Sequence, residues 1–142
     1  EFLVSTNPGQ SPQALNKIAS GGELSRISLA IQVITAQTTH TPILVFDEVD
    51  VGIGGGVAKV FGELLRELGQ KTQIFCVTHQ AQVASQGHNH LYVSKSTGGD
   101  STQTSIVELD EKEIIREVAR MLGGDDFTDE SLAHAQQMVA AR

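Results

Sequence analysis

Two glycines between a serine and a glutamate form the first run that could do chemistry, Ser20-Gly21-Gly22-Glu23. Ser20 followed three residues later by Glu23 is a capping box, and a plain helix start is the simpler interpretation of the run. The two glycines need a further reason, because each costs about 1 kcal/mol relative to alanine in a helix. They leave backbone N–H groups bare at the positive end of the helix dipole, where a phosphate can approach closely.

Two carboxylates, Asp47 and Glu48, follow directly after the continuous apolar run 43–46 (Ile-Leu-Val-Phe). Such a run is typical of a strand buried on both faces of a parallel sheet, and α/β proteins place ligands at the carboxyl ends of such strands. Asp47 could hold Mg²⁺ directly or through water. Glu48 could orient and deprotonate an attacking water. A strand that ends in two solvated acids is the alternative interpretation.

A histidine, His79, stands after a second apolar run at residues 73–77. An imidazole at the end of a buried strand could donate a hydrogen bond to a phosphate oxygen. For a lone histidine, a surface position without function is the alternative. The order of the three sites along the chain says more than any one of them, because all three fall within about sixty residues of an α/β pattern.

These sites need helices and strands to position them. Leu24, Ile27, Ile31 and Ile34 recur at helical spacing after Ser20 and predict an amphipathic helix that fades at residues 38–42. The remaining pattern predicts strands, turns and helices in the following order: strand 1–4, turns in 5–13, strand 43–46, a glycine-rich turn at 52–56, helix 57–68, strand 73–77, a short helix 81–84, a hairpin of strands 91–94 and 104–109, and helices 110–122 and 129–141.

The strand–helix–strand order implies right-handed parallel crossovers, so we expect an α/β fold. More specifically, we expect a mostly parallel sheet flanked by helices, with a terminal β-hairpin. The chain has 142 residues, no internal repeat and no low-complexity segment, which predicts a single domain over residues 1–142. Because it opens with Glu1 rather than methionine, we expect it to be a piece of a longer protein.

Composition limits the partners of the chain. The formal net charge is -7, aromatic residues make up 4% and tryptophan is absent. A nucleic-acid surface usually carries a basic patch with stacking aromatic side chains, which this segment lacks. If the parent protein contacts DNA, we expect the contact to lie mostly elsewhere.

The single cysteine, Cys76, cannot form an internal disulfide, which favours a cytosolic protein. Its place in an apolar run predicts a small buried side chain. The sequence contains neither an apolar run of the roughly 20 residues that a membrane helix needs nor a secretory signal. We therefore expect a cytoplasmic location and no membrane partner.

Together the three sites resemble the ATP-binding machinery of ABC-type ATPases. Residues 18–26 (Ile-Ala-Ser-Gly-Gly-Glu-Leu-Ser-Arg) look like the ABC signature motif. Asp47 and Glu48 resemble the Walker B pair. Asp50 falls at the position of the D-loop aspartate, and His79 at that of the switch histidine.

The sequence is similar to that of the bacterial RecN family of DNA repair proteins, which are SMC-like ATPases. The similarity is carried by residues 22–30 and 46–55, together with Asn7-Pro8-Gly9 and residues 93–95. The resemblance covers nearly the whole chain and is most specific over residues 18–84. One departure is Gln80-Ala81, where the family tends to have Leu-Pro after the switch histidine.

The resemblance implies a C-terminal lobe of an ABC/SMC-type P-loop NTPase head that works as an ATP-sandwiched dimer. In such a head, Asp47 helps to hold Mg²⁺, Glu48 is the general base and His79 senses the γ-phosphate. Ser20, Gly21, Gly22 and Glu23 complete the site of the opposite subunit, and Asp50 links the two sites. An N-terminal lobe and a long coiled coil would precede this segment, and the full protein would repair and recombine chromosomal DNA in association with the nucleoid.

The phosphate-binding loop, Gly-x-x-x-x-Gly-Lys-Ser/Thr, is absent from this sequence. The nearest match, residues 62–72, fails because Gln70 separates Gly69 from Lys71 and because it precedes a strand. A dinucleotide fingerprint at residues 52–57 fails because its sixth position is Val57. We therefore expect the chain alone not to turn over ATP appreciably.

Two alternatives to a DNA repair ATPase remain. One is the nucleotide-binding subunit of a transporter, although such subunits usually have glutamine where Glu23 stands. The other is a non-catalytic dimerisation or docking module, in which Glu48 would be dispensable. A Glu48→Gln substitution separates these interpretations, because only an enzyme would stop hydrolysing ATP.

Overall fold

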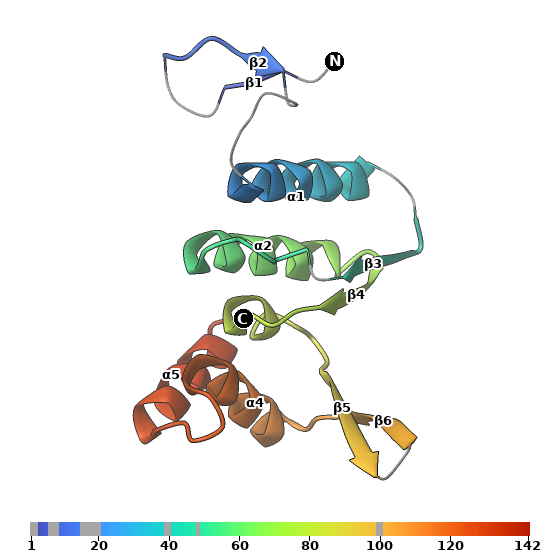
Figure 1. The fold of residues 1–142 in the computed structure, drawn as a ribbon, viewed down its shortest axis with the longest axis vertical. Coiled ribbons are helices and arrows are strands. Elements are labelled where there is room, and N and C mark those ends of the chain that lie inside the picture. Colours follow the sequence, from blue (N-terminus) through green and yellow to red (C-terminus); the bar gives the residue numbers. More distant parts are fainter. Residues whose placement is uncertain (1–2, 6–8, 15–20, 39–40, 48, 99–100) are drawn as a thin grey trace.

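The computed structural model of the chain describes residues 3–5, 9–14, 21–38, 41–47, 49–98 and 101–142. Figure 1 shows a stack of helices with strands beside it. The elements follow one another as β1 (Leu3–Val4), β2 (Gln13–Ala14), α1 (Gly21–Thr38), β3 (Ile43–Asp47), α2 (Gly55–Leu68), β4 (Gln73–Val77), α3 (Ala81–Ala84), β5 (Leu91–Gly98), β6 (Ser101–Glu108), α4 (Glu111–Gly123) and α5 (Asp129–Ala140).

The unit β3–α2–β4 positions the strand-end residues. β3 and β4 pair in parallel, with a register that runs from Ile43 opposite Gln73 to Asp47 opposite Val77. The helix α2 connects the two strands as a crossover, which is the connection that parallel strands require. The predicted strand–helix–strand order is confirmed here.

We expected a mostly parallel sheet, but β3–β4 is the only parallel pair among the described strands. The described residues form three separate two-stranded sheets, β1–β2, β3–β4 and β5–β6, and only β3–β4 is parallel. The hairpin β5–β6 is present as expected, but it is not terminal, because α4 and α5 follow it. The pairing of β1 with β2 was not foreseen, since two-residue strands carry too little periodicity to be recognised.

The expectation that β3 is buried on both faces is wrong. Phe46 is 4% exposed, whereas Ile43 is 50% and Val45 68% exposed. Side chains alternate between the two faces of a strand, so one face of the β3–β4 pair packs inward and the other is open. Phe75 and Val77 on β4 lie on the same open face, at 44% and 53% exposed.

The first hydrophobic core lies between α1, α2 and the inner face of β3–β4. Leu29 and Val33 of α1 pack in one cluster with Phe46 and with Phe61 of α2. The rings of Phe46 and Phe61 meet edge to face, with centroids 6.1 Å apart and planes at 76°. This cluster fixes α2 on one side of the parallel pair and therefore sets where the strands end.

A second core joins α3, α4 and α5, with Ala81, Val118 and Ala135 at its centre. Helix α4 starts with a complete capping box, in which Asp110 accepts from the Glu113 backbone N–H and Glu113 accepts from that of Asp110. The four N-terminal donors of a helix need such partners. Among the helices that the structure describes, none is long and apolar enough to cross a membrane.

Candidate functional site

The carboxyl ends of β3 and β4 bring two of the predicted site residues to one edge. Asp47, the last residue of β3, is exposed and lies opposite Val77, the last residue of β4. His79 follows two residues after Val77, and its side chain is 62% exposed. An exposed carboxylate and an exposed imidazole therefore stand where α/β folds place ligands.

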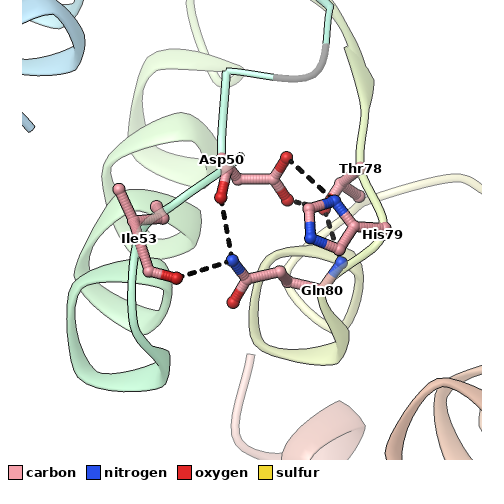
Figure 2. A network of polar contacts seen from close by, with 5 residues as sticks. All are labelled: Asp50, Ile53, Thr78, His79 and Gln80. Carbon is pink, nitrogen blue, oxygen red and sulfur yellow. Dashed lines mark hydrogen bonds and ion pairs between the residues drawn. The ribbon is translucent and has the colours of Figure 1, made fainter. Parts of the chain in front are cut away.

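Behind this edge Asp50 forms a polar network with the loop that follows β4, shown in Figure 2. Asp50 is fully buried, at 0% exposed. Its Oδ2 accepts a hydrogen bond from the Thr78 hydroxyl, and its Oδ1 lies 3.5 Å from His79 Nδ1. The structure thus brings Asp50 and His79 together within one chain.

The Asp50 carboxylate is only partly satisfied. Its Oδ1 accepts no hydrogen bond from the part of the chain that the structure describes. A buried carboxylate without full pairing is costly, so its contact with the His79 ring matters for the stability of the loop. That contact is an ion pair whenever the imidazole is protonated.

Gln80 ties the two loops together, and sequence reasoning gave it no functional role. Its side-chain Nε2 donates to the backbone oxygens of Asp50 and Ile53, at 2.9 Å each. Its backbone N–H donates to the Thr78 hydroxyl oxygen at 3.0 Å. The available signal was its departure from the family pattern, since a glutamine in place of leucine adds two donors.

Cys76 lies on β4 beside this network and is partly buried. Burial, and then the negative charge of Asp50, raise the pKa of its thiol to about 12. The thiolate is the nucleophilic form of cysteine, so a pKa this high makes Cys76 inert at neutral pH. The structure supports its interpretation as a small apolar side chain.

The run Ser20-Gly21-Gly22-Glu23 lies only partly within the described residues. Gly21, Gly22 and Glu23 lie in the first turn of α1, which agrees with the predicted helix start. Ser20 lies outside the described residues, as does Glu48. The capping box of Ser20 with Glu23 and the position of the Glu48 carboxylate therefore stay predictions.

Asp47 suits a magnesium ion of the kind that phosphate sites hold. Among the described residues, no group of three or more histidine, cysteine, aspartate or glutamate side chains could form a metal cage. Mg²⁺ is usually held by one or two carboxylates together with water and phosphate oxygens, and not by an all-protein cage. One exposed carboxylate at the strand edge fits that mode.

The near match to a phosphate-binding loop at residues 62–72 does not form one. Gly62 lies within α2, where its neighbours are Gln82 and Val83 of α3, and Gly69 caps the end of that helix. A phosphate-binding loop would instead follow a strand and open a helix. The structure agrees with its rejection.

Comparison by sequence finds similar proteins in several bacteria, and those described here share one name. No family model matches the chain. The "DNA repair protein RecN" of Vibrio cholerae is 57% identical over 140 residues, which is 99% of this chain and 25% of that protein. The RecN proteins of Treponema pallidum and Bacillus subtilis are 43% and 38% identical, over 99% and 98% of this chain and 25% and 24% of theirs.

Two solved structures resemble the fold. One, described as "Structural biochemistry of ATP-driven dimerization and DNA stimulated activation of SMC ATPases", has a TM-score of 0.64 at 17% identity and covers 84% of this chain and 79% of its own. The other, "SMC head domain from Thermotoga maritima", has a TM-score of 0.55 at 29% identity, covering 72% and 37%. The fold therefore resembles part of an SMC head domain. The sequence groups this chain with the RecN DNA repair proteins, as a segment that spans about a quarter of their length.

Proposed function

We propose that this chain is one part of an ATPase head that acts in the repair and recombination of chromosomal DNA. The observation that carries the proposal is the edge formed by the ends of β3 and β4, where Asp47 and His79 are both exposed and Asp50 joins their loops. In P-loop ATPases, a carboxylate at a strand end holds the metal and neighbouring groups position the phosphates. The RecN relatives support the assignment to DNA repair.

Within one site, the residues divide the work by their chemistry. Asp47 would hold Mg²⁺, which on binding neutralises charge that develops on the phosphate oxygens of ATP. Glu48 would accept the proton of the attacking water. His79 would donate a hydrogen bond from its exposed ring to the γ-phosphate, since its Nδ1 side faces Asp50 and leaves Nε2 as the other ring nitrogen.

The start of α1 would serve the site of a second copy. The backbone N–H groups of Gly21 and Gly22 lie in the first turn of α1, where the helix dipole favours an anion. Ser20 and Glu23 would complete this surface. Asp50 would connect the two sites across the dimer through Thr78 and His79, which its buried carboxylate contacts, and not by touching the second copy itself. Such a homodimer would hold ATP between its two heads.

In the whole protein, ATP binding would close the dimer and hydrolysis would open it, so that nucleotide state controls how DNA is clamped or bridged. The segment would depend on an N-terminal lobe that supplies the phosphate-binding loop and on a coiled coil. With a net charge of -7, this segment would leave most DNA contacts to other parts of the protein. The protein would act in the cytoplasm, at the nucleoid.

A non-catalytic docking module is the second candidate, because the chain presents open apolar surface. Val45 and Val77 are 68% and 53% exposed on the free face of β3–β4, which is the kind of surface that partner binding covers. The transporter alternative gains no such support from the sequence relatives described above, which are RecN proteins.

Steady-state ATP hydrolysis tests the leading proposal directly. We expect no appreciable turnover by this chain alone, because it lacks the loop that binds the β- and γ-phosphates. Mixing it with a separately produced N-terminal lobe should restore hydrolysis. ATP hydrolysis by the chain alone would contradict its assignment as an incomplete ATPase head. A folded mixture that hydrolyses no ATP would favour the docking module.

The Glu48→Gln substitution in that mixture identifies the base. We expect the rate of hydrolysis to fall by about 100-fold or more, which is the usual contribution of a general base. ATP should still bind, and the ATP-bound dimer should accumulate. Gel filtration with ATP would detect the dimer. Glu67→Gln, an exposed change on α2, is the matched control and should leave turnover unchanged. Unaltered hydrolysis in Glu48→Gln would remove this residue from the mechanism.

A further inference from the structure

The turn Asp50–Ile53 is fastened at both ends by one side chain. The Ile53 N–H closes the turn by donating a hydrogen bond to the backbone oxygen of Asp50 at 3.3 Å. Within the turn, Gly52 takes a positive φ of 80°. Gln80 Nε2 donates to the backbone oxygens of Asp50 and Ile53, the first and last residues of this turn (Figure 2). An amide nitrogen carries two hydrogens, so both bonds can form at once.

The same residue also anchors the loop that carries His79. The Gln80 N–H donates to the Thr78 hydroxyl oxygen at 3.0 Å, and that hydroxyl donates to Asp50 Oδ2. His79 stands between Thr78 and Gln80, so its backbone is tied to the Asp50 turn from both sides. The backbone of the His79 loop and the turn cannot separate unless these bonds break.

The donors of Gln80 are not easily replaced. The two ends of the turn that Gln80 contacts are shielded from water, because Ile53 is 6% exposed and Asp50 is fully buried, whereas Val51 and Gly52 between them are exposed. A buried backbone oxygen that loses its donor costs roughly 1–3 kcal/mol when water cannot take the place of that donor. A side chain of equal length without donors would therefore loosen the turn.

We propose that Gln80 is a positioning residue, which locks the Asp50–Ile53 turn to the His79 loop so that both strand ends present their groups as one rigid edge. This role rests on the proposed function, because the rigid edge matters for ATP hydrolysis. The clamp itself does not depend on it and can be measured separately.

Two substitutions in the full-length protein test the clamp. Gln80→Met keeps the length of the side chain and removes both donors. Gln80→Glu keeps the shape and places a carboxylate against two carbonyl oxygens, which repel it until it is protonated. The matched controls are Gln70→Met and Gln70→Glu, on an exposed residue after α2.

Hydrogen–deuterium exchange of a peptide that spans residues 49–54 is the first measurement. We expect about tenfold faster exchange in Gln80→Met than in the unsubstituted protein, because two hydrogen bonds are lost. Gln70→Met should exchange at the unsubstituted rate. Equal exchange in Gln80→Met and the unsubstituted protein would overturn the clamp.

ATP hydrolysis is the second measurement. We expect kcat to fall roughly 10- to 100-fold in Gln80→Met, with KM changed less than about twofold, because displacing a positioned group slows the reaction more than it weakens binding. In Gln80→Glu, kcat relative to the Gln70→Glu control should recover as pH falls and the introduced carboxyl regains a donor. A purely structural role would not produce that pH dependence.

The two measurements distinguish the clamp, the positioning role and the proposed function from one another. Faster exchange with unchanged kcat would overturn the positioning role and leave a structural clamp. A full-length protein that hydrolyses no ATP without any substitution would contradict the proposed function, and with it the catalytic part of this proposal. The exchange rates would still decide whether Gln80 holds the turn.

Discussion

Asp50 shows how far single residues can be predicted from their neighbours in sequence. Asp47 with Glu48, and His79 further along, indicated a site at the strand ends, Asp50 was assigned to it through the family resemblance alone, and the structure places Asp50 beside His79. The partners of Asp50 could not be predicted, because the bonds from Thr78 and Gln80 depend on how two loops about 30 residues apart meet. Glu48 and Ser20 stay predictions, since they lie outside the described residues.

The thiol of Cys76 gives a test at the same scale. Its pKa is raised to about 12 from 9.0 by burial and by the charge of Asp50. At pH 8 only about one thiol in ten thousand is ionised, so we expect alkylation by iodoacetamide to be slower by at least about 100-fold in the folded chain than in urea. Mass spectrometry of timed samples measures the rate. Labelling of the folded chain as fast as the unfolded one would contradict the burial of this side chain.

Elements with a strong pattern were predicted closely, and the reason is periodicity. Residues 57–68 lie within α2, because an apolar repeat over several turns leaves little choice of structure. The shorter runs 73–77 and 81–84 also match β4 and α3. Exposure was predicted less well. An apolar run such as 43–46 indicates a need for burial, but it does not say which other element covers each face, and Val45 is 68% exposed.

The contact between α2 and α3 depends on Gly62, whose packing role no sequence pattern indicated. A Cβ at Gly62 would lie 2.9 Å from the backbone oxygen of Gln82 and 3.2 Å from Val83 Cα, so Gly62→Ala forces the helices apart. We expect a loss of about 1–3 kcal/mol, although alanine normally favours a helix. Gly56→Ala in the same helix meets nothing within 4 Å and should gain up to about 1 kcal/mol.

Urea unfolding followed by circular dichroism compares these two glycine variants. Opposite signs are the expected result, since both substitutions share the gain in helix propensity and only Gly62→Ala meets a neighbouring backbone. A stabilised Gly62→Ala variant would mean that α2 and α3 pack less closely than the structure has them.

At the scale of the whole molecule, the chain buries its two cores and leaves other apolar surface open. The free face of β3–β4 carries Ile43, Val45, Phe75 and Val77, each between 44% and 68% exposed. Contiguous exposed apolar side chains of this kind often mark a surface that a partner covers. They agree with a segment that matches about a quarter of the length of its relatives, and an internal pattern cannot reveal what lies against such a face.

The open sheet face predicts how the isolated chain behaves in solution. We expect concentration-dependent self-association in sedimentation velocity, because pairing the open faces of two copies removes apolar area from water. The double variant Val45→Thr, Val77→Thr keeps the β-branched shape and should weaken association by at least about tenfold, if each lost methyl contributes roughly 0.8 kcal/mol. Val60→Thr, at a position that is 54% exposed on α2, is the control and should associate as the unsubstituted chain does. A chain that stays monomeric at high concentration, or a double variant that associates as strongly as the control, would show that this face is not the adhesive surface.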